Sequence, residues 1–123
     1  MYNSLRKKIT DFYVGIYIRL SKEDENIGES ESIINQKTLL TKYVSDQSYK
    51  LIDIYIDDGF TGTNFDRPAF KKMLKDIELG KINMVITKDL SRLGRNYIQR
   101  LKLKLFIRAL TDPDKELYKG FYR

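Results

Sequence analysis

Three short apolar segments constrain the fold of this chain more than any other feature. They start near residues 14, 51 and 84, which places them 37 and 33 residues apart, and a helical pattern of apolar residues lies in each interval. This spacing is typical of units in which a helix connects two parallel strands. The sequence therefore predicts an α/β fold with an open, mostly parallel sheet flanked by helices.

Each segment has the composition of a strand in such a sheet. Residues 14–18 are almost continuously apolar, which is typical of a strand covered on both faces. Residues 51–56 alternate isoleucines with other residues, and residues 83–87 form a shorter apolar strand. The first strand is expected to end at the rim of the sheet, where Arg19 and Ser21 project to the same side if the extended geometry persists.

Two helical patterns lie between these strands. The first has Gln36 on its apolar stripe, either as a half-exposed edge position or as an amide directed into a site. The second has clear boundary signals, with Asp66 as the expected N-cap and Gly80 as the terminator. Arg67 therefore lies at a helix N-terminus, where backbone N–H groups and the helix dipole favour the binding of anions.

The residue types that the chain lacks exclude several classes of site. The 123 residues include neither cysteine nor histidine, so disulfides, thiolate metal sites, Ser-His-Asp triads and the common zinc sites cannot be built from them. No apolar run approaches the length of about 18 residues that a membrane helix needs, so we expect a soluble, cytoplasmic domain without a membrane partner. The net charge of +6 favours a polyanionic partner.

Polar and charged residues follow all three strands at their carboxyl ends, where open parallel sheets bind ligands. Loops are polar in any protein, and for a single residue that explanation is sufficient. As a set, however, these residues favour arginine, which forms bidentate bonds to phosphate and stays charged in a pocket. The sequence therefore predicts phosphate chemistry at this edge, with the candidates Arg19, Ser21, Asp58, Thr61, Arg67, Lys88, Asp89, Ser91, Arg92 and Arg95.

Four motifs occur in order along the chain: Tyr17-x-Arg19-x-Ser21, Gln36, the segment from Tyr55 to Pro68, and the segment from Lys88 to Asn96. Together they resemble the catalytic domain of serine site-specific recombinases. Within that family of resolvases and invertases, the likeness is greatest to the large recombinases of conjugative transposons and phages. The resemblance covers about residues 12 to 98 and implies a resolvase-like catalytic domain.

The resemblance implies a role for most of the candidates. Ser21 would attack a DNA phosphodiester, forming a 5′-phosphoserine and releasing a 3′-hydroxyl. The family often has an aspartate just before its Arg-Leu-Gly-Arg motif, where this chain has Ser91, with Asp89 two residues earlier, so the carboxylate role there stays open. The family's phosphate-binding arginines match Arg19, Arg67, Arg92 and Arg95, and its orienting carboxylate matches Asp58. Two further polar positions of the family match Gln36 and Thr61.

The expected chemistry requires few additional components. Phosphoryl transfer depends mainly on positioning and electrostatic stabilisation, so clustered arginines can do what a metal ion does elsewhere. No cofactor or metal is therefore expected, although Asp57 and Asp58 offer oxygen ligands that suit Mg²⁺. The expected partners are duplex DNA and, by resemblance, further copies of the chain in a homodimer or tetramer. No small-molecule substrate is expected, because neither a G-x-x-x-x-G-K-[ST] nor a G-x-G-x-x-G sequence occurs.

The likeness ends at about Ile98, and the residues around that point allow two interpretations. Leu93 to Leu110 has the pattern of one helix, whereas the alternation of leucine and lysine in residues 101–105 suits a strand. We expect residues 1–98 to form the catalytic domain and residues 99–123 to form a divergent or truncated basic tail, with no separate DNA-binding domain. The chain is then either a DNA-strand-exchange enzyme or a catalytically silent remnant that binds protein partners or DNA weakly.

Overall fold

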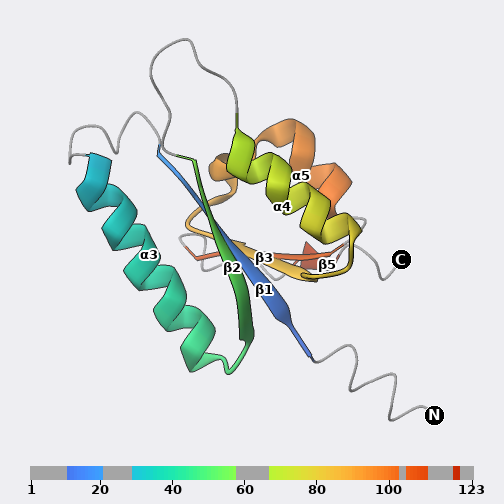
Figure 1. The fold of residues 1–123 in the computed structure, drawn as a ribbon, viewed down its shortest axis with the longest axis horizontal. Helices are drawn as coiled ribbons and strands as arrows, with labels where there is room; N and C mark the ends of the chain where they lie inside the picture. Colours follow the sequence, from blue (N-terminus) through green and yellow to red (C-terminus); the bar gives the residue numbers. More distant parts are fainter. Residues whose placement is uncertain (1–10, 21–28, 58–66, 103–104, 111–117, 120–123) are drawn as a thin grey trace.

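The computed structural model describes the protein over residues 11–20, 29–57, 67–102, 105–110 and 118–119. These residues form a single sheet with helices on both of its faces (Figure 1). The α/β class predicted from the sequence is therefore confirmed.

The described part of the sheet has the strand order β2-β1-β3-β4-β5. β1 to β4 are mutually parallel, and β5 pairs antiparallel with β4, so the sheet is open and mostly parallel as predicted. β1 lies between β2 and β3, which explains why residues 14–18 are apolar and fully buried. In chain order, the strands are β1 (Tyr13–Arg19), β2 (Lys50–Asp57), β3 (Met84–Thr87), β4 (Phe106–Ala109) and β5 (Tyr118–Lys119).

Two helical layers cover the sheet. α3 (Glu29–Asp46) lies on one face, and α4 (Pro68–Glu78) and α5 (Arg95–Lys102) lie on the other (Figure 1). Alternate residues of β1 face the two layers, as side chains of a strand do. Val14, Ile16 and Ile18 pack with α3, whereas Tyr17 packs with α4. A short 3-10 helix, η1 (Leu90–Arg92), lies between β3 and α5 in the chain.

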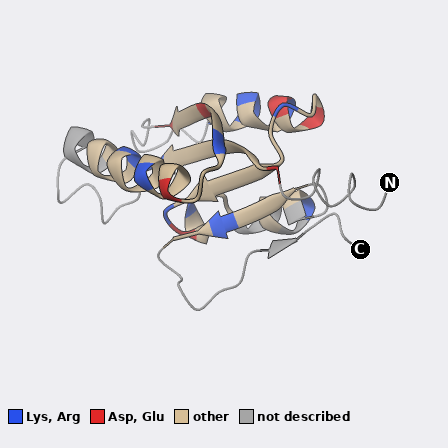
Figure 2. Cartoon of the chain, turned by 90° about the horizontal axis from the view of Figure 1, so that it is seen from below, with Lys and Arg blue, Asp and Glu red and all other residues tan. Residues whose placement is uncertain are grey.

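Charged residues are distributed unevenly over these elements. Figure 2 shows that the described helices carry many charged positions, whereas most of the strand ribbon is uncharged. No helix in the described ranges is long and apolar enough to cross a bilayer.

α4 begins and ends near the predicted positions, with one difference at its N-terminus. Its N-cap is Arg67 rather than the expected Asp66, and the side chain of this N-cap makes no capping hydrogen bond. The predicted terminator is confirmed, because Gly80 has a φ of 78° and its N–H group donates to the carbonyl of Ile77 at 3.0 Å. Glycine adopts this left-handed conformation readily because it lacks a Cβ atom.

The segment after Gly94 differs from both of its predicted structures. A single helix from Leu93 to Leu110 is wrong, because α5 ends at Lys102 and β4 starts at Phe106. A strand over residues 101–105 is wrong as well, because Leu101 and Lys102 belong to α5. β4 pairs with β3, and its Ile107 joins the apolar cluster on the α4 side. α5 thus crosses the expected boundary at residue 98, and the division into a catalytic domain and a tail stays a prediction.

Gly15 in β1 provides a test of the packing between the sheet and α4. A Cβ atom at this position would lie 2.7 Å from Ile82 Cδ1 and 2.9 Å from Tyr55 Cε2, and the Tyr55 ring is anchored by a hydrogen bond to Asp76. We expect Gly15→Ala to lower the free energy of unfolding, measured by urea denaturation, by about 1–3 kcal/mol. The loss should be smaller in an Ile82→Val background, which removes the nearest atom. Equal losses in the two backgrounds would contradict the steric explanation.

Candidate active site

The carbonyl oxygen of Arg19, at the end of β1, joins three segments of the chain. It accepts a hydrogen bond of 2.6 Å from Arg92 Nη1 and one of 3.4 Å from Gln36 Nε2. Gln36 is buried, so of its two predicted placements the half-exposed edge position is wrong, and its amide points to the end of β1. The residue that matters most in the sequence analysis, Ser21, follows two positions later and lies outside the described residues.

Arg92 is held from two directions in the η1 turn. Its side chain is only 4% exposed, and its Nε atom lies 3.3 Å from Asp89 Oδ2, while Nη1 binds the carbonyl of Arg19. Asp89 also caps η1, because its Oδ1 atom accepts hydrogen bonds from the N–H group of Ser91, at 3.0 Å, and from the Ser91 hydroxyl. The carboxylate whose role the sequence left open is therefore paired with a buried arginine, as a buried charge requires.

The guanidinium of Arg67 connects the start of α4 to two other segments. Nη1 and Nη2 donate to the carbonyls of Leu93, at 3.0 Å, and Arg92, at 2.7 Å. Nε donates to the Tyr17 hydroxyl at 3.2 Å, and the guanidinium carbon lies 3.9 Å from the centre of the Phe70 ring. Three of the five N–H groups thus bind uncharged acceptors. These bonds orient the guanidinium without neutralising its charge.

Gly94 gives Arg67 room in the turn between η1 and α5. Its φ of 93° lies in the left-handed region, and a Cβ atom there would approach Arg67 Nη1 to 3.4 Å. The glycine of the Arg-Leu-Gly-Arg motif therefore has a backbone role here. Arg95 follows as the first residue of α5, and its side chain is not described.

Asp57, at the end of β2, is the main residue that the sequence analysis missed. Its Oδ2 atom accepts hydrogen bonds from the Tyr17 hydroxyl at 2.7 Å and the N–H group of Phe70 at 3.0 Å, and Oδ1 accepts one from the N–H group of Ala69 at 2.9 Å. Asp57 thus caps α4 from a different strand, which is the role that the sequence assigned to Asp66. The signal was present in the adjacent aspartates 57 and 58. The sequence analysis offered both as oxygen ligands for Mg²⁺ but gave only Asp58 a role in the recombinase site.

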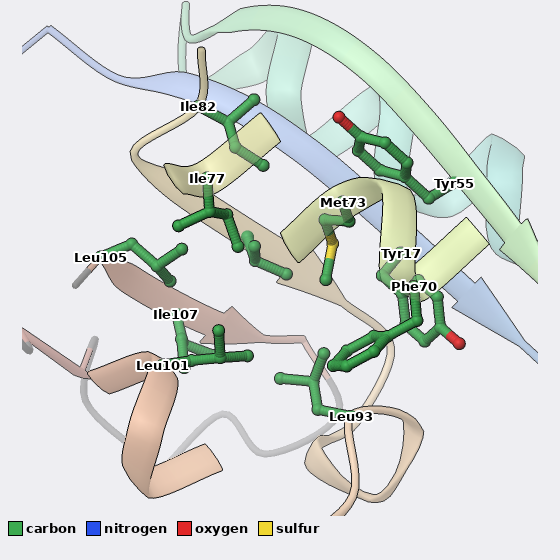
Figure 3. Close-up of a cluster of buried hydrophobic side chains, with 11 residues drawn as sticks. Tyr17, Tyr55, Phe70, Met73, Ile77, Ile82, Leu93, Leu101, Leu105 and Ile107 are labelled. Atoms are coloured by element: carbon green, nitrogen blue, oxygen red, sulfur yellow. The ribbon is translucent and has the colours of Figure 1, made fainter. Parts of the chain in front are cut away.

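Tyr17 lies at one end of the apolar cluster on the α4 side, near Phe70 and Leu93 (Figure 3). Burial raises the pKa of the Tyr17 hydroxyl above its usual range, and the hydrogen bond to Asp57 raises it further, while Arg67 opposes both effects. The phenol therefore stays protonated at neutral pH. It donates a hydrogen bond to the carboxylate of Asp57 and accepts one from the guanidinium of Arg67.

The sequence candidates divide into those that meet at this rim and those whose placement is not described. Lys88 is half-buried and Ser91 is exposed in the turn after β3. Among the described residues, no group of three acidic side chains is placed to hold a metal ion. The candidates that meet at the rim are Arg19, Gln36, Arg67, Asp89 and Arg92. Those outside the described residues are Ser21, Asp58 and Thr61.

Comparison with known protein families agrees with the motifs and with the fold. Residues 14–111 match the family described as "Resolvase, N terminal domain". The chain belongs to the resolvase family. The expected end of the likeness at about Ile98 is therefore wrong, because the matched region continues to residue 111 and includes β4, which pairs with β3.

Solved structures of recombinases share the fold of this resolvase-family chain. The N-terminal catalytic domain of TP901-1 integrase is 30% identical, with a TM-score of 0.66, and the match covers 81% of this chain and 79% of that one. The C-terminal catalytic domain of ISC1926 TnpA, an IS607-like serine recombinase, is 26% identical, with a TM-score of 0.65 and coverage of 80% and 69%. A resolvase family site-specific recombinase from Streptococcus pneumoniae, 23% identical with a TM-score of 0.64 over 83% and 74% of the two chains, supports the fold alone.

Two relatives differ greatly in length. A putative DNA recombinase of Bacillus subtilis (strain 168) is 32% identical over 100 residues, which are 81% of this chain and 19% of that protein. The chain therefore spans about a fifth of that relative. Uncharacterized immunity region protein 3 of Bacillus phage phi105 is 40% identical over 67 residues, which are 54% of this chain and 80% of the phage protein.

Arg92 is expected to be essential for the stability of the rim. Arg92→Met removes the donor to the Arg19 carbonyl and the ion-pair partner of Asp89, so we expect the free energy of unfolding to fall by about 2–4 kcal/mol. Arg100→Met, on the exposed side of α5, is the matched control and should change it by less than about 0.5 kcal/mol. Urea denaturation of both variants measures the difference, and similar values for the two would contradict the assigned role.

Burial and the hydrogen bond to Asp76 raise the pKa of Tyr55, as burial and Asp57 raise that of Tyr17. These two shifts predict that the stability of the protein depends on pH. Below about pH 10 both phenols are protonated in the folded and the unfolded chain, so their contribution is complete. Above that pH the unfolded chain loses these protons first, and the free energy of unfolding should fall by up to about 1.4 kcal/mol per pH unit for each phenol. Urea denaturation between pH 8 and pH 11 should show a shallower decline for Tyr17→Phe, and an unchanged decline would contradict the shift.

Proposed function

We propose that this chain is the catalytic domain of a serine site-specific recombinase, in which Ser21 attacks a phosphodiester of duplex DNA. The junction at the end of β1 carries the proposal. Arg92 binds the Arg19 carbonyl, and Arg67 binds the Arg92 carbonyl, so two arginines from distant segments are linked to the end of β1. Ser21 follows that end by two positions in the sequence. Membership of the resolvase family and the likeness to recombinase catalytic domains support the same conclusion.

The proposed reaction is a phosphoryl transfer to a serine oxygen. Ser21 Oγ forms a bond to phosphorus and gives up its proton, while the bond from phosphorus to the 3′ oxygen breaks and that oxygen leaves as a hydroxyl. The product is a 5′-phosphoserine ester, so the phosphodiester bond that breaks is replaced by another ester bond to phosphorus. A 3′-hydroxyl of the exchanged strand can therefore reverse the step without a nucleotide cofactor.

The arginines of the rim suit the charge that develops on the phosphate. Arg67 is oriented by two carbonyls and a phenol, and among the contacts of the described residues these bonds use three of its five N–H groups. We propose that the other two bind phosphate oxygens. Each charge-assisted hydrogen bond is worth about 1.5–3 kcal/mol, so two or three such bonds would lower the barrier by several kcal/mol. The buried Arg92 contributes by fixing the strand end before Ser21.

The proposed partners follow from the same chemistry. Duplex DNA is a polyanion, and the chain has a net charge of +6. Assembly as a homodimer or tetramer is proposed from the resemblance to serine recombinases. The catalytic part is proposed to include residues 1–98.

A second candidate function has an observation in its favour. The phage phi105 relative aligns over 67 residues that are 80% of its length, so this relative is shorter than the chain itself. A small protein of this kind could bind DNA or an intact recombinase without cleaving DNA. This chain would then act as a silent recombinase remnant.

A covalent-adduct assay separates the two functions. The protein is incubated with a pool of nicked suicide duplexes, and denaturing electrophoresis detects protein that stays attached to DNA. The proposed enzyme should give an adduct, Ser21→Ala should give none, and Ser45→Ala, an exposed serine of α3, should match the unaltered protein. An adduct that persists in Ser21→Ala, or its absence at high protein concentration, would overturn the recombinase proposal. DNA binding without an adduct would favour the second candidate.

A further inference from the structure

Two buried tyrosine–aspartate pairs stabilise the α4 side of the sheet, and they differ in one respect. Tyr17 donates to Asp57 Oδ2 at 2.7 Å, and Tyr55 donates to Asp76 Oδ2 at 2.6 Å. Both phenols are at most 2% exposed. The first pair joins β1 to β2 and reaches α4 through the bond from the Phe70 N–H group to Asp57, whereas the second joins β2 to α4 directly. Of the two phenols, the hydroxyl of Tyr17 also binds an arginine, Arg67, among the contacts of the described residues.

The first pair forms a directional chain of hydrogen bonds. The Arg67 Nε–H group donates to the Tyr17 oxygen, and the Tyr17 hydroxyl donates to Asp57. Because a carboxylate is a strong acceptor, it fixes the direction of the phenolic proton and leaves the oxygen lone pairs for the guanidinium. The orientation of Arg67 therefore depends on the carboxylate of Asp57, although the hydrogen bonds reach it through Tyr17.

Asp57 acts on Arg67 by a second route through the backbone. Its two oxygens accept the N–H groups of Ala69 and Phe70 in the first turn of α4, and Arg67 is the N-cap of that helix. A carboxylate at a helix N-terminus also interacts favourably with the helix dipole. The same residue thus fixes both the backbone that carries Arg67 and the hydrogen-bond partner of its Nε atom.

We propose that Asp57 is a positioning residue of the recombinase site, which holds the Arg67 guanidinium in place through Tyr17 and the first turn of α4. The inference rests on the proposed function for the role of Arg67 as a phosphate ligand. Asp57 itself does not touch the reacting phosphate in this scheme. Its carboxylate accepts three hydrogen bonds from the protein itself, two from the first turn of α4 and one from Tyr17.

The second pair provides a matched control, because Tyr17→Phe and Tyr55→Phe each remove one buried hydrogen bond to a carboxylate. Nitrogen-15 NMR of the Arg67 Nε–H group reports its position without any DNA. We expect Tyr17→Phe to shift this resonance and to speed its exchange with water, whereas Tyr55→Phe should leave both unchanged. Asp57→Asn should act like Tyr17→Phe, and Asp76→Asn should act like Tyr55→Phe.

The adduct assay then tests whether the placement of Arg67 matters for the reaction. We expect Tyr17→Phe and Asp57→Asn to slow adduct formation by about 100-fold, as a small misplacement of a catalytic group does. Tyr55→Phe and Asp76→Asn, measured at a temperature where all variants are folded by circular dichroism, should stay within about threefold of the unaltered protein.

The outcomes for the two proposals are separable. An Arg67 resonance that is unchanged in Tyr17→Phe and Asp57→Asn would overturn the positioning role, whether or not an adduct forms. A shifted resonance with adduct rates equal to those of the control pair would overturn it as well. If the unaltered protein forms no adduct, the proposed recombinase function fails, and the NMR measurement still decides whether Asp57 holds Arg67.

Discussion

The hydrogen bonds between the Arg67 guanidinium and uncharged acceptors are the interaction on which the rest of the site depends. Two backbone carbonyls and one phenol oxygen orient the guanidinium, and the Phe70 ring lies against it. A carboxylate partner would orient an arginine equally well, but it would also cancel most of its charge. Neutral acceptors fix the orientation of the guanidinium and leave its positive charge able to attract an anion. Phosphoryl transfer requires this kind of preorganisation.

The parallel sheet explains why this arrangement lies where it does. β1, β2 and β3 run in the same direction, so Arg19, Asp57 and the turn that contains Arg92 all reach the same rim. The carbonyl of Arg19 collects donors from α3 and η1. Charged groups that are buried in this way need several partners each, and the rim supplies them mostly from the backbone. The end of β1 is therefore fixed immediately before the proposed nucleophile.

The helix cap of α4 shows how the same chemical problem can be solved by a distant residue. The sequence predicted that Asp66 would cap the helix, because N-caps are usually adjacent in the chain. Asp57 performs that role from β2, and in doing so it binds Tyr17, which a cap from the helix's own segment would not reach. Tyr55 and Asp76 repeat the phenol–carboxylate bond farther along α4, and no arginine joins this pair in the described part of the chain. The same type of bond, from a tyrosine hydroxyl to an aspartate, thus contributes to stability at one position and to the geometry of the site at the other.

The sequence by itself determined the α/β class, the order of the elements up to the third strand and the family, because apolar periodicity, strand spacing and short motifs are local properties of the chain. It also identified Arg67 and Arg92 as residues of one rim, since parallel strands end at one edge. Only the tertiary structure decided that Arg92 binds the Arg19 carbonyl, that Asp57 rather than Asp66 caps α4, and that a helix and a strand follow Gly94. These features depend on hydrogen-bond partners 12 to 73 positions apart in the chain, and no local pattern specifies such pairings.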